Sequence, residues 1–154
     1  MNLGAIQITK TRKHAADGPG DHPQSGVTFT VNGVTTTATD ANGVTCVSGL
    51  PFGAYTVHEN VPAGYSGEAD KSVTVDQRDL TTDCSGNPET VSFHNTSLTN
   101  LNVTIGSQID GGTSTHVAYT NTAIDGDTGA KGDGTFVADD LQPGTYVCTV
   151  VIDP

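Results

Sequence analysis

The sequence is short of basic residues, and this shortage excludes two classes of partner. Only 6 of its 154 residues are lysine or arginine, against 17 aspartates and glutamates, and the formal net charge is -11. Nucleic acids and anionic membrane surfaces both require a basic protein surface, so neither is expected to bind. No apolar run approaches the ~20 residues that a membrane span needs, and no membrane insertion is expected.

The sequence also has few aromatic and charged residues. It has no tryptophan, only four tyrosines and four phenylalanines, and 15% charged residues. So little charge argues against a disordered chain, and the scarcity of helix-forming residues argues against a helical bundle. Glycine and threonine are abundant instead, which favours strands joined by tight turns. The chain shows no signal peptide and no cell-wall sorting tail, which a fragment of a surface protein would also lack.

Cysteine and histidine are too few and too scattered to indicate a metal site. The three cysteines form no C-x-x-C pair, and no histidine stands at a metal-binding spacing, so neither zinc nor another cofactor is expected. Cys46 and Cys84 are predicted to form a disulfide within the first domain. The alternative is that Cys46 is a reduced core residue and Cys84 an exposed loop thiol. Cys148 shares a strand phase with Tyr146 and Val150 and is expected to be a small buried residue, unless it pairs outside this chain.

Two further motifs carry little weight. The run 125–129, followed by Asp133, suggests a calcium loop but lacks the glycine and glutamate of an EF-hand, so a solvated acidic turn is favoured. Residues 102–104 match a glycosylation sequon within an expected strand. The sequence contains no Ser/His/Asp constellation and no phosphate-binding glycine loop.

Short alternating segments bounded by turn signals indicate an all-β fold. Asn32-Gly33 and Asn42-Gly43 are strong hairpin signals, and Thr11–Gly26 reads as a polar loop. The predicted strands span residues 4–10, 27–31, 34–39, 44–47, 55–59, 71–75 and 89–95. Strands of this length, with turns every ~8–12 residues, are typical of an antiparallel sandwich.

An internal repeat predicts two modules. Residues 42–57 match residues 133–148 without a gap, which favours two tandem Greek-key β-sandwich modules of prealbumin or immunoglobulin type. We place the boundary in the polar segment 96–100, giving domains 1–97 and 98–154. The second module is smaller, because nothing in it corresponds to residues 71–95. It is either a shorter sandwich or one completed by material outside this chain.

Three polar residues continue the apolar faces of three predicted strands. Lys10 is in phase with two isoleucines, Glu59 with a tyrosine and a valine, and Asn95 with a valine and a phenylalanine. An unpaired charge in a core costs several kcal/mol, so these groups are expected to find one another or to react. In the second module, Ile105 and Val150 stand where the first has Lys10 and Glu59.

An amine, a carboxyl group and a carboxamide in one dry interior can condense. Burial favours the uncharged form of Lys10, which is a nucleophile. The same burial favours the protonated form of Glu59, which can polarise the Asn95 carbonyl and carry a proton to the departing ammonia. Orientation within the fold can lower such a barrier by ~7–11 kcal/mol. The reaction is single-turnover and its substrate is the protein itself, so the chain is not expected to be an enzyme.

The same residues also allow a purely structural interpretation. Lys10 could extend from the strand end to water, with Glu59 as its ion-pair partner and Asn95 as a turn former. Lys71 is a competing amine, but it stands outside the first strand.

Five motifs, in matching order and spacing, resemble a known family. They are residues 4–10, 39–43, 49–59, 62–65 and 91–95. Together they are similar to the B-type (Cna-B, SpaA-like) prealbumin-fold domains that build the stalks of Gram-positive adhesins and pilins. In that family a first-strand lysine forms an isopeptide bond with a last-strand asparagine beside a catalytic glutamate. The resemblance implies these roles for Lys10, Asn95 and Glu59, and it covers the second module only at the level of the fold.

The expected function is therefore a structural stalk or adhesin module of a secreted or cell-wall-associated surface protein. Its expected partners are neighbouring modules of the same surface protein or a host extracellular protein. Two alternatives remain open: a sandwich whose loops bind a host protein or carbohydrate, and an accessory domain of a secreted hydrolase. The scarcity of aromatic residues disfavours the first of these, the ligand-binding sandwich.

Overall fold

The computed structural model describes residues 2–13, 18–77, 80–105, 113–119, 122–124 and 134–152, with backbone alone at 105, 113–119, 122–124, 134–136 and 148–152. The chain divides into two compact units, Met1–Ser97 (unit 1) and Leu98–Pro154 (unit 2). All the named elements are β-strands, so the prediction of an all-β fold is confirmed. Within the described residues, no helix is long and apolar enough to cross a membrane.

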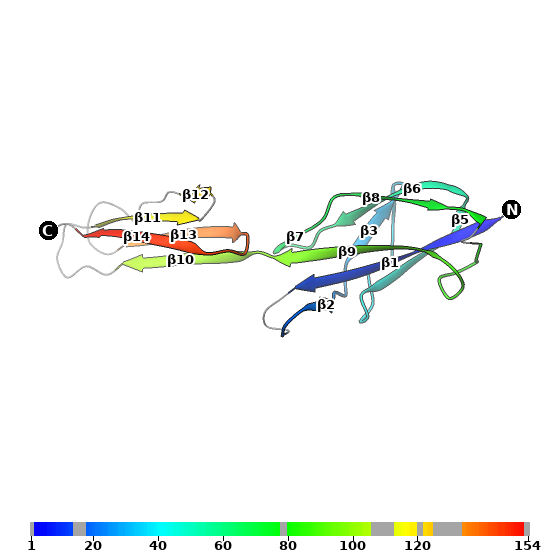
Figure 1. Ribbon diagram of the computed structural model, residues 1–154, viewed down its shortest axis with the longest axis horizontal. Coiled ribbons are helices and arrows are strands. Elements are labelled where there is room, and N and C mark those ends of the chain that lie inside the picture. Colours follow the sequence, from blue (N-terminus) through cyan, green and yellow to red (C-terminus); the bar gives the residue numbers. More distant parts are fainter. Residues whose placement is uncertain are drawn as a thin grey trace. The chain divides into compact units, whose positions relative to one another are not determined.

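Unit 1 contains two sheets (Figure 1). In the five-stranded sheet the order is β2-β1-β9-β7, and β5 also pairs with β1. Its strands are β1 (Leu3–Lys13), β2 (Asp21–Pro23), β5 (Val44–Pro51), β7 (Tyr65–Ser66) and β9 (Glu89–Ser97). The four-stranded sheet has the order β4-β3-β6-β8. Its strands are β3 (Thr28–Val31), β4 (Val34–Thr35), β6 (Gly53–Asn60) and β8 (Lys71–Val75).

The core of unit 1 forms between the two sheets from residues that alternate along each strand. It consists of Ile6, Ile8, Val27, Phe29, Val31, Val57, Val73, Val75, Val91 and Phe93. The rings of Phe29 in β3 and Phe93 in β9 lie 5.1 Å apart in a tilted arrangement, which joins the two sheets. The period-two pattern of the sequence is therefore the pattern of burial, because successive side chains of a strand face opposite sides.

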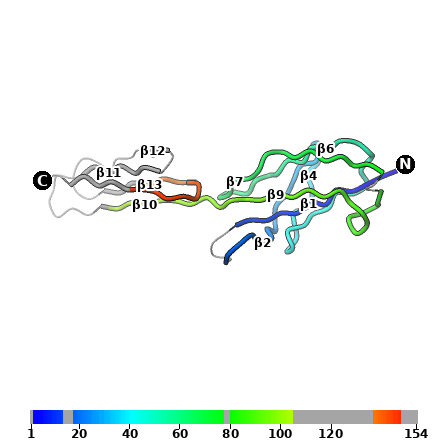
Figure 2. The backbone as a smooth tube through the Cα atoms, viewed as in Figure 1, coloured from blue at the N-terminus to red at the C-terminus, as the bar shows by residue number. Residues whose placement is uncertain are grey.

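One strand pair differs from the predicted antiparallel arrangement. β1 and β9 run parallel, with Ile8 opposite Val91 and Lys10 opposite Phe93, and their traces lie side by side in Figure 2. The alternation of buried residues is the same for either strand direction, so the sequence pattern could not distinguish the two. The parallel pairing brings the first and last strands of unit 1 together along eight residues of register, from Ile6 to Lys13 on β1.

Several strand limits also differ from the prediction. β9 runs to Ser97 and β10 begins at Thr99, so the expected irregular segment 96–100 is mostly strand. β2 lies within the expected loop 11–26. The strand expected at 34–39 ends after Thr35, because the hydroxyls of Thr36 and Thr39 accept hydrogen bonds from the N–H groups of β3 and of the residue before it.

Unit 2 repeats part of this arrangement. β10 pairs with β13, and β11 pairs with β12 and β14. The strands are β10 (Thr99–Ile105), β11 (Thr113–Tyr119), β12 (Thr122–Ile124), β13 (Gly134–Leu141) and β14 (Tyr146–Ile152). The acidic run 125–133, which is predicted to be a solvated turn rather than a calcium loop, lies outside the described residues, as does the side chain of Cys148.

The register of β1 against β5 reappears in β10 against β13. In unit 1, Gly4 is opposite Leu50, Ile6 opposite Val47 and Ile8 opposite Thr45, with an irregularity between Gly4 and Ile6. In unit 2, Thr99 is opposite Leu141, Leu101 opposite Ala138 and Val103 opposite Phe136, with an irregularity between Thr99 and Leu101. These are the positions that the repeat of residues 42–57 at 133–148 makes equivalent.

A tyrosine contact is also shared by the two units. The Tyr55 hydroxyl donates to the carbonyl oxygen of Pro51 at 2.7 Å, and the Tyr146 hydroxyl donates to that of Gln142 at 2.6 Å. Both tyrosines lie in the strand after the tight connection, and both bonds span four residues. The repeat detected in the sequence is thus a repeat of pairing register and of side-chain contact.

Candidate cross-linking site

Lys10, Glu59 and Asn95 come from three strands and meet in the interior of unit 1. Lys10 lies in β1, Glu59 in β6 and Asn95 in β9, so both sheets contribute. Their exposed fractions are 0%, 2% and 0%. Each side chain continues the buried face of its strand, as the alternation of the sequence indicates. The alternative in which Lys10 extends to water is wrong, because its side chain is fully buried.

The backbone of Lys10 is held at the point where β1 changes partners from β5 to β2. Its N–H donates to the carbonyl oxygen of Gly43 at 2.7 Å, and its own carbonyl oxygen accepts from the Gln24 N–H at 3.0 Å. Gly43 has a φ of +73°, and a Cβ there would lie 2.2 Å from the Lys10 carbonyl oxygen. The turn at Asn42-Gly43 therefore needs glycine both for its conformation and for its close approach to Lys10.

One carboxylate oxygen is shared by the amine and the carboxamide. The Lys10 Nζ lies 3.6 Å from Glu59 Oε1, and Asn95 Nδ2 donates a hydrogen bond to the same oxygen at 2.7 Å. Lys10 Nζ also donates to the Thr11 carbonyl oxygen at 2.8 Å. Glu59 Oε1 thus lies close to both the amine and the nitrogen of the carboxamide.

The two remaining oxygens of the site are buried without a partner. Glu59 Oε2 and Asn95 Oδ1 have no hydrogen-bond partner among the described residues. A Cβ on Gly67 would lie 3.0 Å from Glu59 Oε2 and 3.3 Å from Asn95 Oδ1, so both oxygens lie beneath the same backbone segment. A buried polar atom without a partner is costly, and such atoms often mark a place where chemistry occurs.

Burial alters the proton affinity of the amine. Desolvation lowers the pKa of Lys10, and the negative charge and hydrogen bonding of Glu59 oppose this effect without cancelling it. The amine therefore loses its proton more readily than a lysine in water. An uncharged amine next to a carboxamide, with a carboxyl group touching both, has the components needed for amide exchange.

Lys71, the competing amine, is engaged elsewhere. Its Nζ donates to the Ser92 carbonyl oxygen at 2.5 Å, lies 3.2 Å from Glu68 Oε2 and sits 4.8 Å from the centre of the Phe93 ring. Its side chain is 36% exposed, whereas that of Lys10 is fully buried. Of the two lysines, Lys10 is the one that contacts the carboxylate bonded to Asn95.

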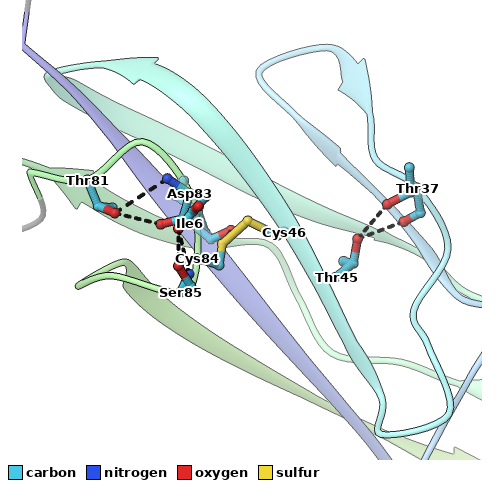
Figure 3. The surroundings of a disulfide bond; sticks show 8 residues. All are labelled: Ile6, Thr37, Thr45, Cys46, Thr81, Asp83, Cys84 and Ser85. Atoms are coloured by element: carbon cyan, nitrogen blue, oxygen red, sulfur yellow. Dashed lines mark hydrogen bonds between the residues drawn. A yellow bond between two sulfur atoms is a disulfide. The ribbon is translucent and has the colours of Figure 1, made fainter.

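Cys46 and Cys84 form a disulfide between β5 and the loop that precedes β9 (Figure 3). Cys84 Sγ also lies 3.4 Å from the Ile6 carbonyl oxygen, on the central strand β1. Hydrogen bonds of Thr81 and Ser85 with Asp83 shape the same loop. The disulfide therefore fastens the chain just upstream of β9, the strand that carries Asn95. No metal-binding group of side chains occurs within the described part of the chain.

Two residues near the site were missed by the sequence patterns. Gly67 covers the two unpartnered oxygens, and Glu68 Oε2 accepts a hydrogen bond from the His94 N–H at 2.6 Å, next to Asn95. Both residues lie in the connection between β7 and β8, where no alternation exists to indicate which way a side chain points.

Comparison with known proteins gives a family for most of this unit. The family model of the SpaA prealbumin-like fold domain matches residues 4–90, more than half of the chain. No curated protein matches.

Solved structures share the fold at low identity. The TIE protein of Bacillus anthracis has a TM-score of 0.52 and 20% identity, over 99% of this chain and 29% of that one. A streptococcal ancillary pilin has the same score and identity, over 99% of this chain and 54% of the other. The full-length major pilin SpaD of Corynebacterium diphtheriae scores 0.52 at 15% identity, over 96% of this chain and 55% of the pilin. The chain thus spans about half or less of the length of these similar proteins.

Proposed function

Because this chain belongs to the SpaA prealbumin-like domain family, we propose that it is a structural stalk module of a Gram-positive surface protein, cross-linked internally between Lys10 and Asn95. In this proposal the protein is secreted and held at the cell wall, and its neighbours are further modules of the same surface protein. Domain 1–97 carries the isopeptide, and domain 98–154 is a shorter module without the residues that form it.

One observation carries the proposal: Glu59 Oε1 touches both the nucleophile and the leaving group. It lies 3.6 Å from Lys10 Nζ and 2.7 Å from Asn95 Nδ2. A single oxygen at that position can take a proton from the amine and deliver it to the nitrogen that must leave. No movement of a strand is needed between the two transfers, which is the condition for a large gain from orientation.

The proposed step conserves atoms and protons. The ammonium of Lys10 gives one proton to Glu59, and the neutral Nζ attacks Cγ of Asn95. The protonated Glu59 stabilises the oxygen of the tetrahedral intermediate and passes its proton to Nδ2, which leaves as ammonia when the Cγ–Nδ2 bond breaks. Nζ then gives its second proton to Glu59, which releases it to solvent. The product is one secondary amide between the two side chains, and no oxidant, metal or co-reactant is required.

The cross-link would connect the first and last strands of unit 1. The loop-entropy relation gives about 4–5 kcal/mol for closing the segment from Lys10 to Asn95. The bond also lies across the two parallel strands that continue toward the ends of the unit. A pull on those ends would pass through the covalent bond and leave residues 10–95 without tension, which is the property that a stalk module requires.

Single-molecule extension of the chain under reducing conditions tests the mechanical role. In the wild type we expect the segment 10–95 to stay closed at forces that unfold unit 2. In E59A we expect that segment to unravel, adding a length of ~3.3–3.6 Å for each residue released. K71R serves as the matched control, and it should behave as the wild type. Equal extension of the wild type and E59A would contradict the proposal.

A further inference from the structure

The segment from Gly67 to Lys71, which we call the clasp, replaces a neighbouring strand at one edge of β9. Alternate residues of a strand direct their N–H and C=O groups to opposite edges, so Ser92 and His94 present theirs at the same edge. There Glu68 Oε2 accepts from the His94 N–H at 2.6 Å, and Lys71 Nζ donates to the Ser92 carbonyl oxygen at 2.5 Å. The two side chains also pair with each other at 3.2 Å.

The clasp is also a wall between the buried site and the solvent. Gly67 is exposed on its outer side. On its inner side, a Cβ would lie 2.5 Å from a methyl group of Val61, 3.0 Å from Glu59 Oε2 and 3.3 Å from Asn95 Oδ1. Only the absence of a side chain lets the backbone pass this close to the two oxygens. The backbone at Gly67 thus lies between the exposed surface and these two oxygens.

We propose that Glu68 is a positioning residue for the condensation of Lys10 with Asn95, because it holds β9 through the residue next to Asn95. This inference rests on the proposed function. The hydrogen bond to the His94 N–H fixes the backbone next to Asn95, and that backbone sets the place of the carboxamide against Glu59. Loss of this hydrogen bond would move Cγ of Asn95 relative to Lys10 Nζ and would let water reach the site.

The charge of Glu68 and its hydrogen bond to β9 are expected to have opposite effects on the rate of condensation. The two roles can therefore be distinguished. Its negative charge favours the protonated form of Lys10 and so works against the neutral amine. If Glu68 acted through its charge, removing that charge would accelerate the reaction. If Glu68 acts through its hydrogen bond, shortening the side chain slows the reaction even when the charge is kept.

Two conservative variants distinguish these roles. E68Q keeps the length and an oxygen that can accept from the His94 N–H, but it loses the charge. E68D keeps the charge but is one methylene too short to reach. D70N is the matched control, because Asp70 is an exposed carboxylate two residues away that contacts His58 instead. Each chain is made by timed cell-free synthesis, and the loss of one ammonia is followed by intact mass.

We expect E68D to lose ammonia at least about tenfold more slowly than D70N, because a displacement of 1 Å can lower a rate about 100-fold. E68Q should match or exceed the wild-type rate, because it removes a negative charge that favours the protonated form of Lys10. Formation of the Cys46–Cys84 disulfide and resistance to protease, measured in the same samples, confirm that each variant has folded.

Three outcomes would overturn the inference. E68D and D70N could react at equal rates, E68Q could be as slow as E68D, or E68D could be slow only because it fails to form the disulfide and the protease-resistant fold. The first two leave the proposed function intact, provided the wild type loses one ammonia. A wild type that loses none removes the proposed function itself, and the inference with it.

Discussion

The two units of this chain share a pattern of strand pairing and differ in the residues at two equivalent strand positions. β1 and β5 pair in the same register as β10 and β13, including the irregularity near the start of the first strand. The tyrosine contact after the tight connection is also present in both. Yet the equivalents of Lys10 and Glu59 are Ile105 and Val150.

This difference separates the requirements of the fold from those of the chemistry. A skeleton that recurs with apolar residues at both positions does not need an amine or a carboxylate there. Replacing a buried ion pair by apolar groups is often neutral or stabilising, so retaining the charged pair in unit 1 indicates a use other than packing. No segment of the unit 2 sequence matches residues 71–95, so unit 2 also has no equivalent of Asn95. The amine, the carboxylate and the carboxamide are therefore all missing from unit 2.

The largest effect should come from breaking the pair in unit 1 on one side only. E59V removes the proton shuttle and leaves the Lys10 amine buried without its partner. We expect unit 1 of this variant to be roughly 3–5 kcal/mol less stable than that of the double variant K10I/E59V, which carries the residues of unit 2. Relative to the wild type, this loss adds to that of the cross-link, which both variants lack. Denaturant unfolding of both proteins gives the difference. Equal stabilities would show that Lys10 is not confined in the interior.

The next effect is the loss of the cross-link itself. K10I/E59V should fold and keep the Cys46–Cys84 disulfide. Its intact mass should show no loss of ammonia. Its free energy of unfolding for unit 1 should be about 4–5 kcal/mol below that of the wild type, from the loop-entropy relation. K71R, which leaves the proposed bond in place, is the reference. If the double variant unfolded at the same denaturant concentration as K71R, the bond would have no stabilising role.

Reduction of the disulfide should affect unit 1 and leave unit 2 unchanged. The bond joins residues separated by 38 positions. Closing such a loop contributes about 4 kcal/mol by the same relation, before any strain is considered. The position of Cys46 in the repeat is taken by Val137 in unit 2, which has no equivalent bond to lose. Proteolysis with and without reductant, followed by mass mapping, should show increased cleavage in unit 1 alone.

The close approach of Gly43 to Lys10 predicts a smaller effect. In G43A the new Cβ would meet the Lys10 carbonyl oxygen, and alanine disfavours the positive φ of this turn. We expect a loss of about 1–3 kcal/mol and a slower loss of ammonia, because the backbone of Lys10 is displaced. G26A is the matched control, since Gly26 also has a positive φ but a Cβ there would meet no atom within 4 Å. A G43A variant that reacts at the rate of G26A would show that the turn does not position Lys10.

The smallest effect is a dependence of stability on pH in a chain that cannot react. In N95A the Lys10 amine stays free, and burial lowers its pKa in the folded state below that of the unfolded chain. Between those two values the unfolded chain binds more protons, so the stability of unit 1 should rise with pH. The rise should end near the ordinary pKa of lysine. Unfolding of N95A and of K10I/N95A across this range provides the test, and the second variant should lack the rise.

Much of this site follows from the sequence, because strands impose a rule on side-chain direction. Alternation alone places Lys10, Glu59 and Asn95 on buried faces, and the structure brings all three side chains together. Alternation says nothing about strand direction, so the parallel pairing of β1 with β9 was missed. It also says nothing about connections, so Gly67 and Glu68 were missed, although their contacts close the site.

Sequencing of the branched peptide after proteolysis tests the central claim most directly. The account predicts one fragment in which the Lys10 side chain is joined to that of Asn95, lighter by one ammonia than its two components. This fragment should be present in the wild type and in K71R and absent from E59A. Recovery of the Lys10 and Asn95 peptides as separate, unmodified species from the folded wild type would contradict the account.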